Sequence, residues 1–108
     1  MMNILRGEIE VELGGRKRLV KFGLNQMAIY TQKHRIDLSE MTTIGVAEIR
    51  DLIWSGLVAG AKKKGEEIDF DEWQVGDWLE EMEQTEYDAV MQTFQKAMPS
   101  GDGDAKKK

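Results

Sequence analysis

The sequence predicts an α+β fold that is mainly α: an N-terminal β-hairpin followed by about four short helices in one compact domain, with a disordered C-terminal tail. Apolar and charged residues alternate on both sides of Gly14-Gly15, as in a hairpin. Apolar residues recur at helical spacing through most of residues 24–98. A chain of 108 residues makes about one domain. We therefore expect a single domain over residues 1–98 and a flexible tail over 99–108.

The hairpin is predicted together with its register. Residues 8–13 alternate acidic and β-prone apolar side chains, and residues 16–22 form the returning strand. A two-residue Gly turn sets these partners opposite each other: Leu13 and Arg16, Glu12 and Lys17, Ile9 and Val20, Glu8 and Lys21. Oppositely charged cross-strand pairs contribute roughly 0.2–1 kcal/mol each, which helps to fix this register. An isolated hairpin is marginally stable, so we expect helices to cover its apolar face.

Two helices are predicted in the first half of the remaining chain. The first spans Leu24 to His34, with a predicted apolar face of Leu24, Met27, Ala28 and Thr31. A one-turn helix is a candidate near residues 38–41. The next helix begins at Val46 and carries a broad apolar stripe: Ile49, Leu52, Ile53, Gly56, Leu57 and Gly60. It is expected to be central and buried, and to end at Lys62-Lys63-Lys64-Gly65, where the lysines meet the negative end of the helix dipole.

Two further helices are predicted after residue 65. Asp69 is the expected N-cap of one, with Glu72 completing a capping box and Ile68 packing on Trp73, and this helix runs to about Glu83. Thr85 is the expected N-cap of the last. Its apolar positions follow helical spacing: Tyr87, Val90, Met91, Phe94 and Met98. Pro99 ends it, and the following Gly, Asp and Lys residues have nothing to bury.

Composition and charge restrict the class of protein. Cysteine is absent, which excludes disulfides and thiolate chemistry and fits a reducing cytoplasm. Neither a signal peptide nor a membrane-spanning stretch is recognisable, so we expect no membrane association. The net charge of −5 combines +4 over residues 1–35, −12 over residues 36–105 and +3 from the last three lysines. Residues 66–88 carry eleven acidic side chains and no basic one. This segment would repel a phosphate backbone, so nucleic acid is an improbable partner.

No pattern of catalytic or metal-binding residues is present. His34 is the single histidine and has no second ligand or nucleophile near it in sequence, which favours a surface or capping role. Asp69, Asp71 and Glu72 depart from a calcium loop because Trp73 stands at a ligand position. Residues 56–62 resemble a phosphate loop only loosely, and small residues that let a neighbouring helix approach explain them better. We therefore predict no cofactor, no metal and no enzymatic activity.

Large apolar side chains are in surplus for so small a domain. Most of them belong to the core, as Met and aromatic stripes at helical spacing usually do. However, Trp73 and Trp78 are five residues apart and lie on different faces of one helix, which makes full burial of both difficult. At least one of them is expected to be exposed and to meet a protein partner. The candidate partner-binding residues are Trp54, Trp73, Trp78, Met82, Met91 and Phe94.

The order of elements and three segments carry a resemblance to a known family. The segments are residues 6–22, residues 50–57 (RDLIWSGL) and residues 75–79 (VGDWL). In this order they resemble the tail assembly chaperones of long-tailed, siphovirus-type bacteriophages and of the related gene transfer agents. The resemblance implies a small, mostly helical protein of the host cell cytoplasm that binds the tape measure protein. It also implies that this protein keeps the tape measure protein soluble until tail tube protein polymerises around it, and is then absent from the mature virion.

Other interpretations remain open from the sequence. An acidic inhibitor that mimics DNA would also be small and negatively charged. A virion structural protein, such as a head-tail joining subunit, would share the size and the lack of catalysis. Homo-oligomers could form through attraction between the basic hairpin and the acidic helices of neighbouring copies. Lys106-Lys107-Lys108 fits either a slippery codon run that yields a frameshifted longer form or a solubilising charged tail.

Overall fold

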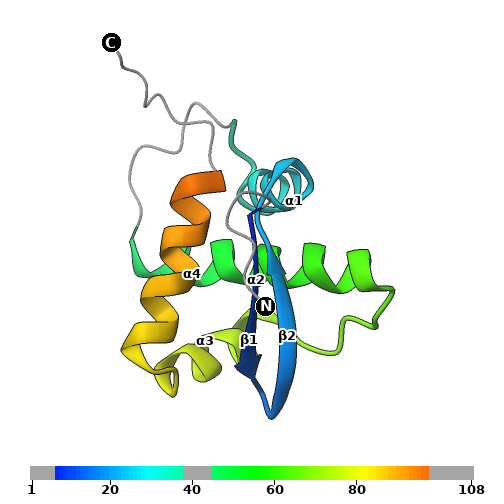
Figure 1. The fold of residues 1–108 in the computed structure, drawn as a ribbon. Helices are drawn as coiled ribbons and strands as arrows, with labels where there is room; N and C mark the ends of the chain where they lie inside the picture. Colours follow the sequence, from blue (N-terminus) through cyan, green and yellow to red (C-terminus); the bar gives the residue numbers. More distant parts are fainter. Residues whose placement is uncertain (1–6, 38–44, 98–108) are drawn as a thin grey trace.

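The hairpin and helices form one layered unit around a shared core. The structure is a computed structural model that describes residues 7–37 and 45–97. Its elements in chain order are β1 (Glu8–Leu13), β2 (Arg16–Lys21), α1 (Leu24–His34), α2 (Val46–Lys64), α3 (Glu72–Glu80) and α4 (Gln84–Ala97) (Figure 1). The predicted fold class, mainly α with an N-terminal hairpin, is confirmed. The candidate one-turn helix, Met98, Pro99 and the tail lie outside the described residues.

The strands pair in the predicted register. β1 and β2 are antiparallel, with Ile9 opposite Val20 and Glu8 opposite Lys21. Gly14 and Gly15 both have positive φ, at 63° and 86°, as the two central positions of a tight hairpin turn of the favoured hand require. The Lys21 Nζ lies 3.4 Å from the Glu8 Oε2, so one of the predicted cross-strand charge pairs is an ion pair.

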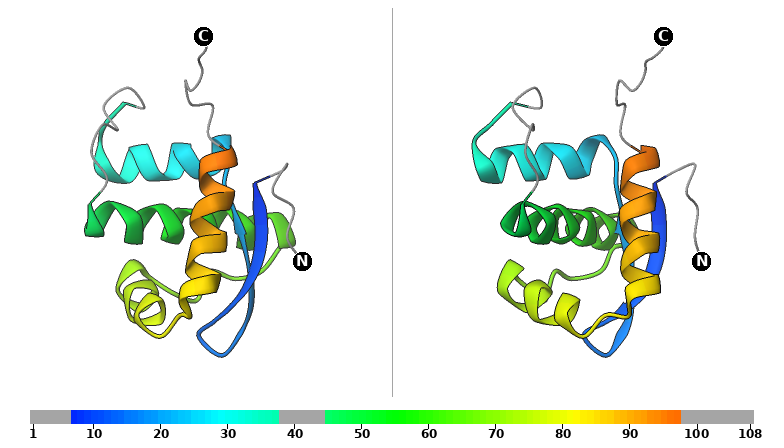
Figure 2. Two further views of the ribbon diagram at one scale, coloured as in Figure 1. Left: turned by 60° about the vertical axis from the view of Figure 1, so that its left-hand side comes forward. Right: turned by 90° about the vertical axis from the view of Figure 1, so that its left-hand side faces the viewer.

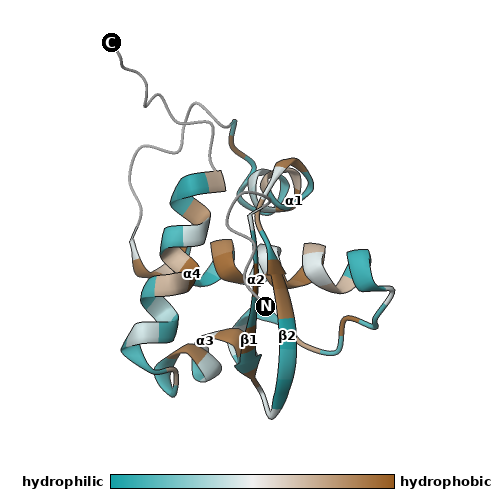
Figure 3. Ribbon diagram, in the orientation of Figure 1, coloured by the Kyte–Doolittle hydropathy of each residue, from teal (hydrophilic) through white to brown (hydrophobic). Residues whose placement is uncertain are grey.

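Helix α2 is the central element, as predicted. It runs behind the hairpin in Figure 1, and several of its turns are brown in Figure 3, which marks the apolar part of the helix. All residues from Asp51 to Ala61 except Trp54 are buried. Gly65 ends the helix in the left-handed conformation, with φ of 71°. A Cβ on Gly60 would overlap the Leu19 carbonyl oxygen of β2. The small residues of α2 therefore allow a strand to approach closely, and not a helix as we expected.

Helix α1 has the predicted bounds, but of its predicted buried face (Leu24, Met27, Ala28 and Thr31) only Met27 is buried. It lies beside α2 and runs in the opposite direction (Figure 2). Gln26, Met27 and Tyr30 are buried, whereas Leu24 is 87% exposed. The Gln26 side-chain amide donates to the Ser55 Oγ of α2 at 3.0 Å. Because the buried Gln26 amide needs a hydrogen-bond partner, the face of α1 that contains Gln26 lies against α2. The spacing of apolar residues does not indicate that a polar residue belongs to the buried face.

The last two helices begin at other residues than predicted. Asp71, and not Asp69, caps α3: its carboxylate accepts from the Gln74 backbone N–H at 2.9 Å. Asp69 instead accepts from the Arg18 guanidinium at 3.2 Å. Helix α3 ends at Glu80, and α4 begins at Gln84, so Thr85 lies within its first turn and is not its cap.

The core lies between the hairpin, α2 and α4. In Figure 2, α4 crosses the directions of α1 and α2 steeply and lies close to the hairpin. The Phe94 ring of α4 meets the Phe22 ring edge to face, with centroids 5.2 Å apart. The largest apolar side chains that are almost fully buried are Phe22, Tyr30, Leu52, Ile53 and Leu57. This packing fixes α2, on which α3 and the candidate site are built.

Candidate functional site

An apolar groove lies where the first half of α2 meets α3 and the start of α4. It has a volume of about 380 Å³. Its lining residues are Val46, Ile49, Arg50, Trp73, Gly76, Asp77, Leu79, Glu80 and Tyr87. We call it the Trp73 groove. Since three helices form it, its walls present side chains and no free sheet edge.

Trp73 is the most exposed aromatic side chain of the groove, at 72% of its surface. Trp73 is the second residue of α3, two positions after the Asp71 cap, and its indole lies outside the core. The Arg50 guanidinium carbon lies 5.5 Å from the centroid of the Trp73 ring, within the range of a cation–π contact. Val46, at the other side of the groove, is 87% exposed. Exposed large apolar side chains that gather in a hollow are typical of a protein-binding surface.

Gly76 keeps the groove open. A Cβ at this position would stand 3.3 Å from the Arg50 Cδ, which is tighter than an ordinary packing contact. The absence of a side chain lets α3 approach α2 and leaves the space beside Trp73 unfilled. The groove therefore results from a local sequence feature, the glycine three residues after the exposed tryptophan.

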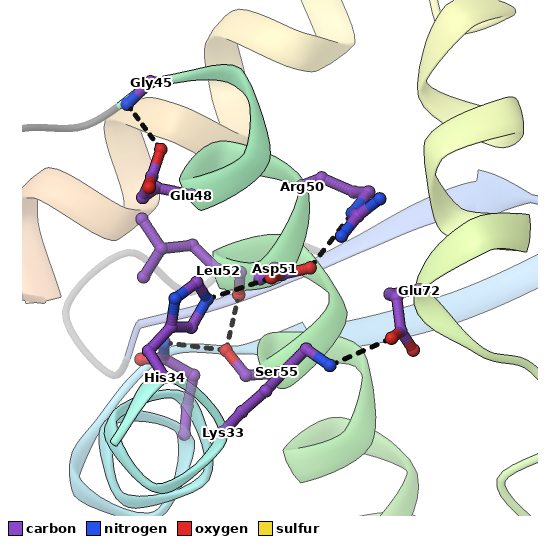
Figure 4. Close-up of polar contacts among 10 residues, drawn as sticks. Lys33, His34, Gly45, Glu48, Arg50, Asp51, Leu52, Ser55 and Glu72 are labelled. Carbon is purple, nitrogen blue, oxygen red and sulfur yellow. Dashed lines mark hydrogen bonds and ion pairs between the residues drawn. The ribbon is translucent and has the colours of Figure 1, made fainter. Parts of the chain in front are cut away.

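A polar cluster beneath the groove holds the helices in place (Figure 4). Asp51 is only 3% exposed, and its two carboxylate oxygens take different partners. The Arg50 Nε donates to Oδ1 at 3.0 Å, and the His34 Nε2 lies 2.9 Å from Oδ2. The His34 ring stacks on Tyr30 with centroids 4.4 Å apart. These contacts join α1 to α2 and fix the Arg50 side chain that forms one wall of the groove.

An ion pair joins α1 to α3. The Lys33 Nζ donates to the Glu72 Oε2 at 2.9 Å. This hydrogen bond is the largest cause of the lowered pKa of the Glu72 carboxyl, and a hydrogen bond from the Glu72 backbone is the second. The pair lies one residue before Trp73 and so helps to orient the first turn of α3.

The other two tryptophans do not line the groove. Trp78 lies under the Arg18 guanidinium, 4.4 Å from the ring, and packs against the hairpin turn at Gly14. Trp54 is half-buried, with the Lys33 Nζ 5.1 Å from its ring. Its indole N–H is buried and has no hydrogen-bond partner among the described residues. The expectation that Trp73 and Trp78 are not both fully buried is confirmed, and Trp73 is the exposed one.

The predicted residues on and near α4 belong to the domain interior or its margin. Phe94 is 6% exposed and is part of the core, so it is not accessible to a partner in this structure. Met82 and Met91 are half-buried and pack against the core. Of the six candidate partner-binding residues, only Trp73 lines the groove. The sequence does not indicate the other apolar lining residues, Val46, Ile49, Leu79 and Tyr87, as partner-binding residues. Ile49 and Tyr87 follow the helical spacing of apolar residues, which is also typical of a core.

No catalytic or metal-binding arrangement is recognisable in the part of the chain that the structure describes. No three His, Asp or Glu side chains within residues 7–37 and 45–97 are placed to hold a metal ion. His34 and Asp51 have no Ser, Thr or Lys nucleophile in hydrogen-bond contact with them among these residues. The cluster in Figure 4 joins α1 to α2 through His34 and Asp51.

A second hollow lies at the other end of α2. It has a volume of about 930 Å³ and includes Leu24, Ile29 and Ala59 together with Lys62 and Lys63. Its charges are partly satisfied, since Lys63 donates to Glu8 of the hairpin. In none of the described helices is there an apolar stretch long enough to span a bilayer.

Comparisons with known proteins found no match to the chain among family models, curated proteins or solved structures.

Proposed function

We propose that this chain is a tail assembly chaperone of a long-tailed bacteriophage or gene transfer agent, and that it binds the tape measure protein without enzymatic activity. The observation that carries the proposal is the exposure of Trp73, at 72%, in an apolar groove between helices. The order of hairpin and helices, which resembles that family, supports it. The place of action would be the host cytoplasm, and the protein would be absent from the mature virion.

The groove suits an apolar helix as client. Amphipathic helices commonly bind by placing apolar side chains at positions i, i+3 or i+4 and i+7 into a groove between helices. Trp73 offers a large anchor, and the space above Gly76 accepts a client side chain. Covering the exposed 72% of one indole contributes roughly 3–4 kcal/mol from apolar burial. Binding alone would then keep a helical client from associating with itself.

The acidic surface has a different character from that of a DNA mimic. Three of the carboxylates between residues 66 and 72 form ion pairs with basic residues of other elements: Glu66 with Arg16, Asp69 with Arg18, and Glu72 with Lys33. A mimic needs an uninterrupted set of negative charges at the spacing of phosphates. These pairs interrupt the series and favour a protein-binding role.

Co-expression tests the proposal. The tape measure protein encoded beside this chain is expressed alone and together with the chain, and soluble client is measured. We expect the chain to raise the soluble yield and to co-purify with the client in a fixed ratio. A client that stays insoluble at several-fold excess of the chain would contradict the proposal. Mass spectrometry of purified particles separates a chaperone from a structural protein, because only the latter persists.

A further inference from the structure

Among the described residues that line the Trp73 groove, the charged side chains without an ion pair are all acidic. Asp77 and Glu80 of α3 line it, and their spacing of three residues places them on the same side of the helix. Both side chains are exposed, and neither forms an ion pair with any residue in 7–37 or 45–97. Glu81 and Glu83, which follow α3, and Glu86, in the first turn of α4, also form no ion pair with a described residue.

Arg50 is the basic side chain among the described residues that line the groove, and its charge is already paired with that of Asp51. The Arg50 Nε donates to the Asp51 Oδ1 at 3.0 Å, and Asp51 is buried. The Arg50 guanidinium carbon also lies 5.5 Å from the centroid of the Trp73 ring. Arg50 therefore adds little positive potential for a ligand, and the field at the groove is set by Asp77 and Glu80.

Two carboxylates outside the groove are arranged differently. Glu8 of the hairpin contacts Lys21 and Lys63, and Glu72 contacts Lys33. These acidic side chains are matched by basic ones from another element of the same chain. Asp77 and Glu80 have no such ion pair among the described residues. They border an apolar surface, so a binding partner that covers this surface also removes water from the two carboxylates. This desolvation costs free energy unless the partner supplies an opposite charge.

We propose that the occupant of the Trp73 groove is a basic amphipathic helix, with apolar residues at i, i+3 or i+4 and i+7 and with Lys or Arg on the flanks. This inference rests on the proposed function and specifies the client segment that would be recognised. Its apolar stripe covers Trp73 and Gly76, and its basic flank meets Asp77 and Glu80. Charge complementarity of this kind selects among apolar helices and accelerates their association.

A second copy of the chain fits the groove less well. Two of the three lysines that line the hollow at its exposed Leu24, Lys21 and Lys63, already contact Glu8. Recruiting them to another subunit would break these pairs. A foreign basic helix brings cations that have no such contacts to lose.

Two designed peptides test the inference. Both are helices of about 18 residues, long enough for measurable helicity, with the same apolar stripe and with either Lys or Glu on both flanks. Binding to the full chain is measured by calorimetry. We expect the Lys peptide to bind at least about tenfold more tightly than the Glu peptide. Raising the ionic strength from about 0.1 M to about 1 M should reduce this difference, because the Debye length falls from ~10 Å to ~3 Å.

Matched variants locate the charge effect. Asp77→Asn combined with Glu80→Gln should weaken the Lys peptide about threefold to tenfold, as expected for two exposed charge contacts. Glu67→Gln removes one exposed carboxylate outside the groove and should leave the affinity unchanged. Circular dichroism of each variant checks that the fold is retained.

The outcomes separate this inference from the proposed function. Equal binding of the two peptides, abolished in both by Trp73→Ala, would overturn the charge inference and leave the apolar groove as a client site. Failure of both peptides, together with capture of the tape measure protein that is unaffected by Trp73→Ala, would overturn the inference and exclude the groove as the client site, whereas absence of capture by the wild-type chain would contradict the proposed function. Self-association that Trp73→Ala disrupts, without peptide binding, would assign the groove to a second copy and overturn the inference.

Discussion

Single aromatic residues in this protein differ in what they contact. Trp78 is covered by Arg18 and the hairpin turn, and Phe94 meets Phe22 in the core. Trp73 contacts the Arg50 guanidinium and otherwise faces solvent. Removing Trp73 should therefore affect binding, whereas removing Phe94 should affect folding.

Alanine substitutions test this difference. Trp73→Ala should change the free energy of unfolding by no more than about 0.5 kcal/mol, as is usual for an exposed site. Phe94→Ala should lower it by roughly 3–5 kcal/mol, because a buried aromatic ring leaves a cavity. Urea denaturation followed by circular dichroism measures both. A large loss for Trp73→Ala would show that its indole stabilises the domain and would remove the reason to regard it as a binding residue.

At the scale of elements, prediction succeeded where local sequence decides and failed where a distant partner does. The hairpin register follows from Gly14-Gly15 and the alternating strands, all within residues 8–22. The buried face of α1 depends on the bond from Gln26 to Ser55, which only the packed structure supplies. Asp69 and Asp71 both suit an N-cap, and the contact with Arg18 of the hairpin decides between them.

The candidate site was predictable in part for the same reason. The five-residue spacing of Trp73 and Trp78 indicated that one indole would be exposed. The groove itself needs Val46 and Ile49 from α2 beside α3, and the sequence does not show that these segments meet. Apolar residues at helical spacing look alike whether they line a core or a groove.

The contact between α2 and the hairpin gives a prediction at this scale. Gly60→Ala should lower the free energy of unfolding by about 1–3 kcal/mol or more, because the new Cβ meets the backbone of Leu19. Gly23→Ala is the matched control, since a Cβ there meets no atom within 4 Å. Denaturant midpoints of the two variants provide the comparison. Equal midpoints would mean that α2 does not lie against β2 as closely as described.

Ion pairs between elements predict acid sensitivity. The pKa of Glu8 is lowered, chiefly by its hydrogen bond from Lys63 of α2, and that of Glu72 by its hydrogen bond from Lys33 of α1. A carboxyl group with a lowered pKa in the folded state stabilises the fold when the pH is above its pKa in the unfolded state, about 4.3 for Glu. This stabilisation is lost as the pH falls through the pKa of the folded state.

The measurement is the urea midpoint between about pH 6 and pH 3. We expect it to fall below about pH 4.3, and to fall less steeply when Glu8→Gln and Glu72→Gln are combined. A midpoint that stays constant, or a double variant with the same slope as the wild type, would argue against these links between elements.

At the scale of the whole molecule, the core and the proposed binding surface share one helix. The second half of α2 packs on the hairpin through Gly56 and Gly60, and its first half provides Val46, Ile49 and Arg50 to the groove. One helix thus joins the buried core to an apolar surface. This arrangement is consistent with passive binding, in which no nucleotide or conformational step is required.

Capture of the tape measure protein by variant chains is the most direct test of the proposed role. Each variant is co-expressed with the tape measure protein, and the client that co-purifies is quantified. Leu24→Ala is the matched control, since Leu24 of α1 is even more exposed than Trp73 and lines the hollow at the other end of α2. We predict that Trp73→Ala lowers captured client at least about tenfold, as for a binding hot spot, while Leu24→Ala captures as much as the wild type. Equal capture by both variants would contradict the account.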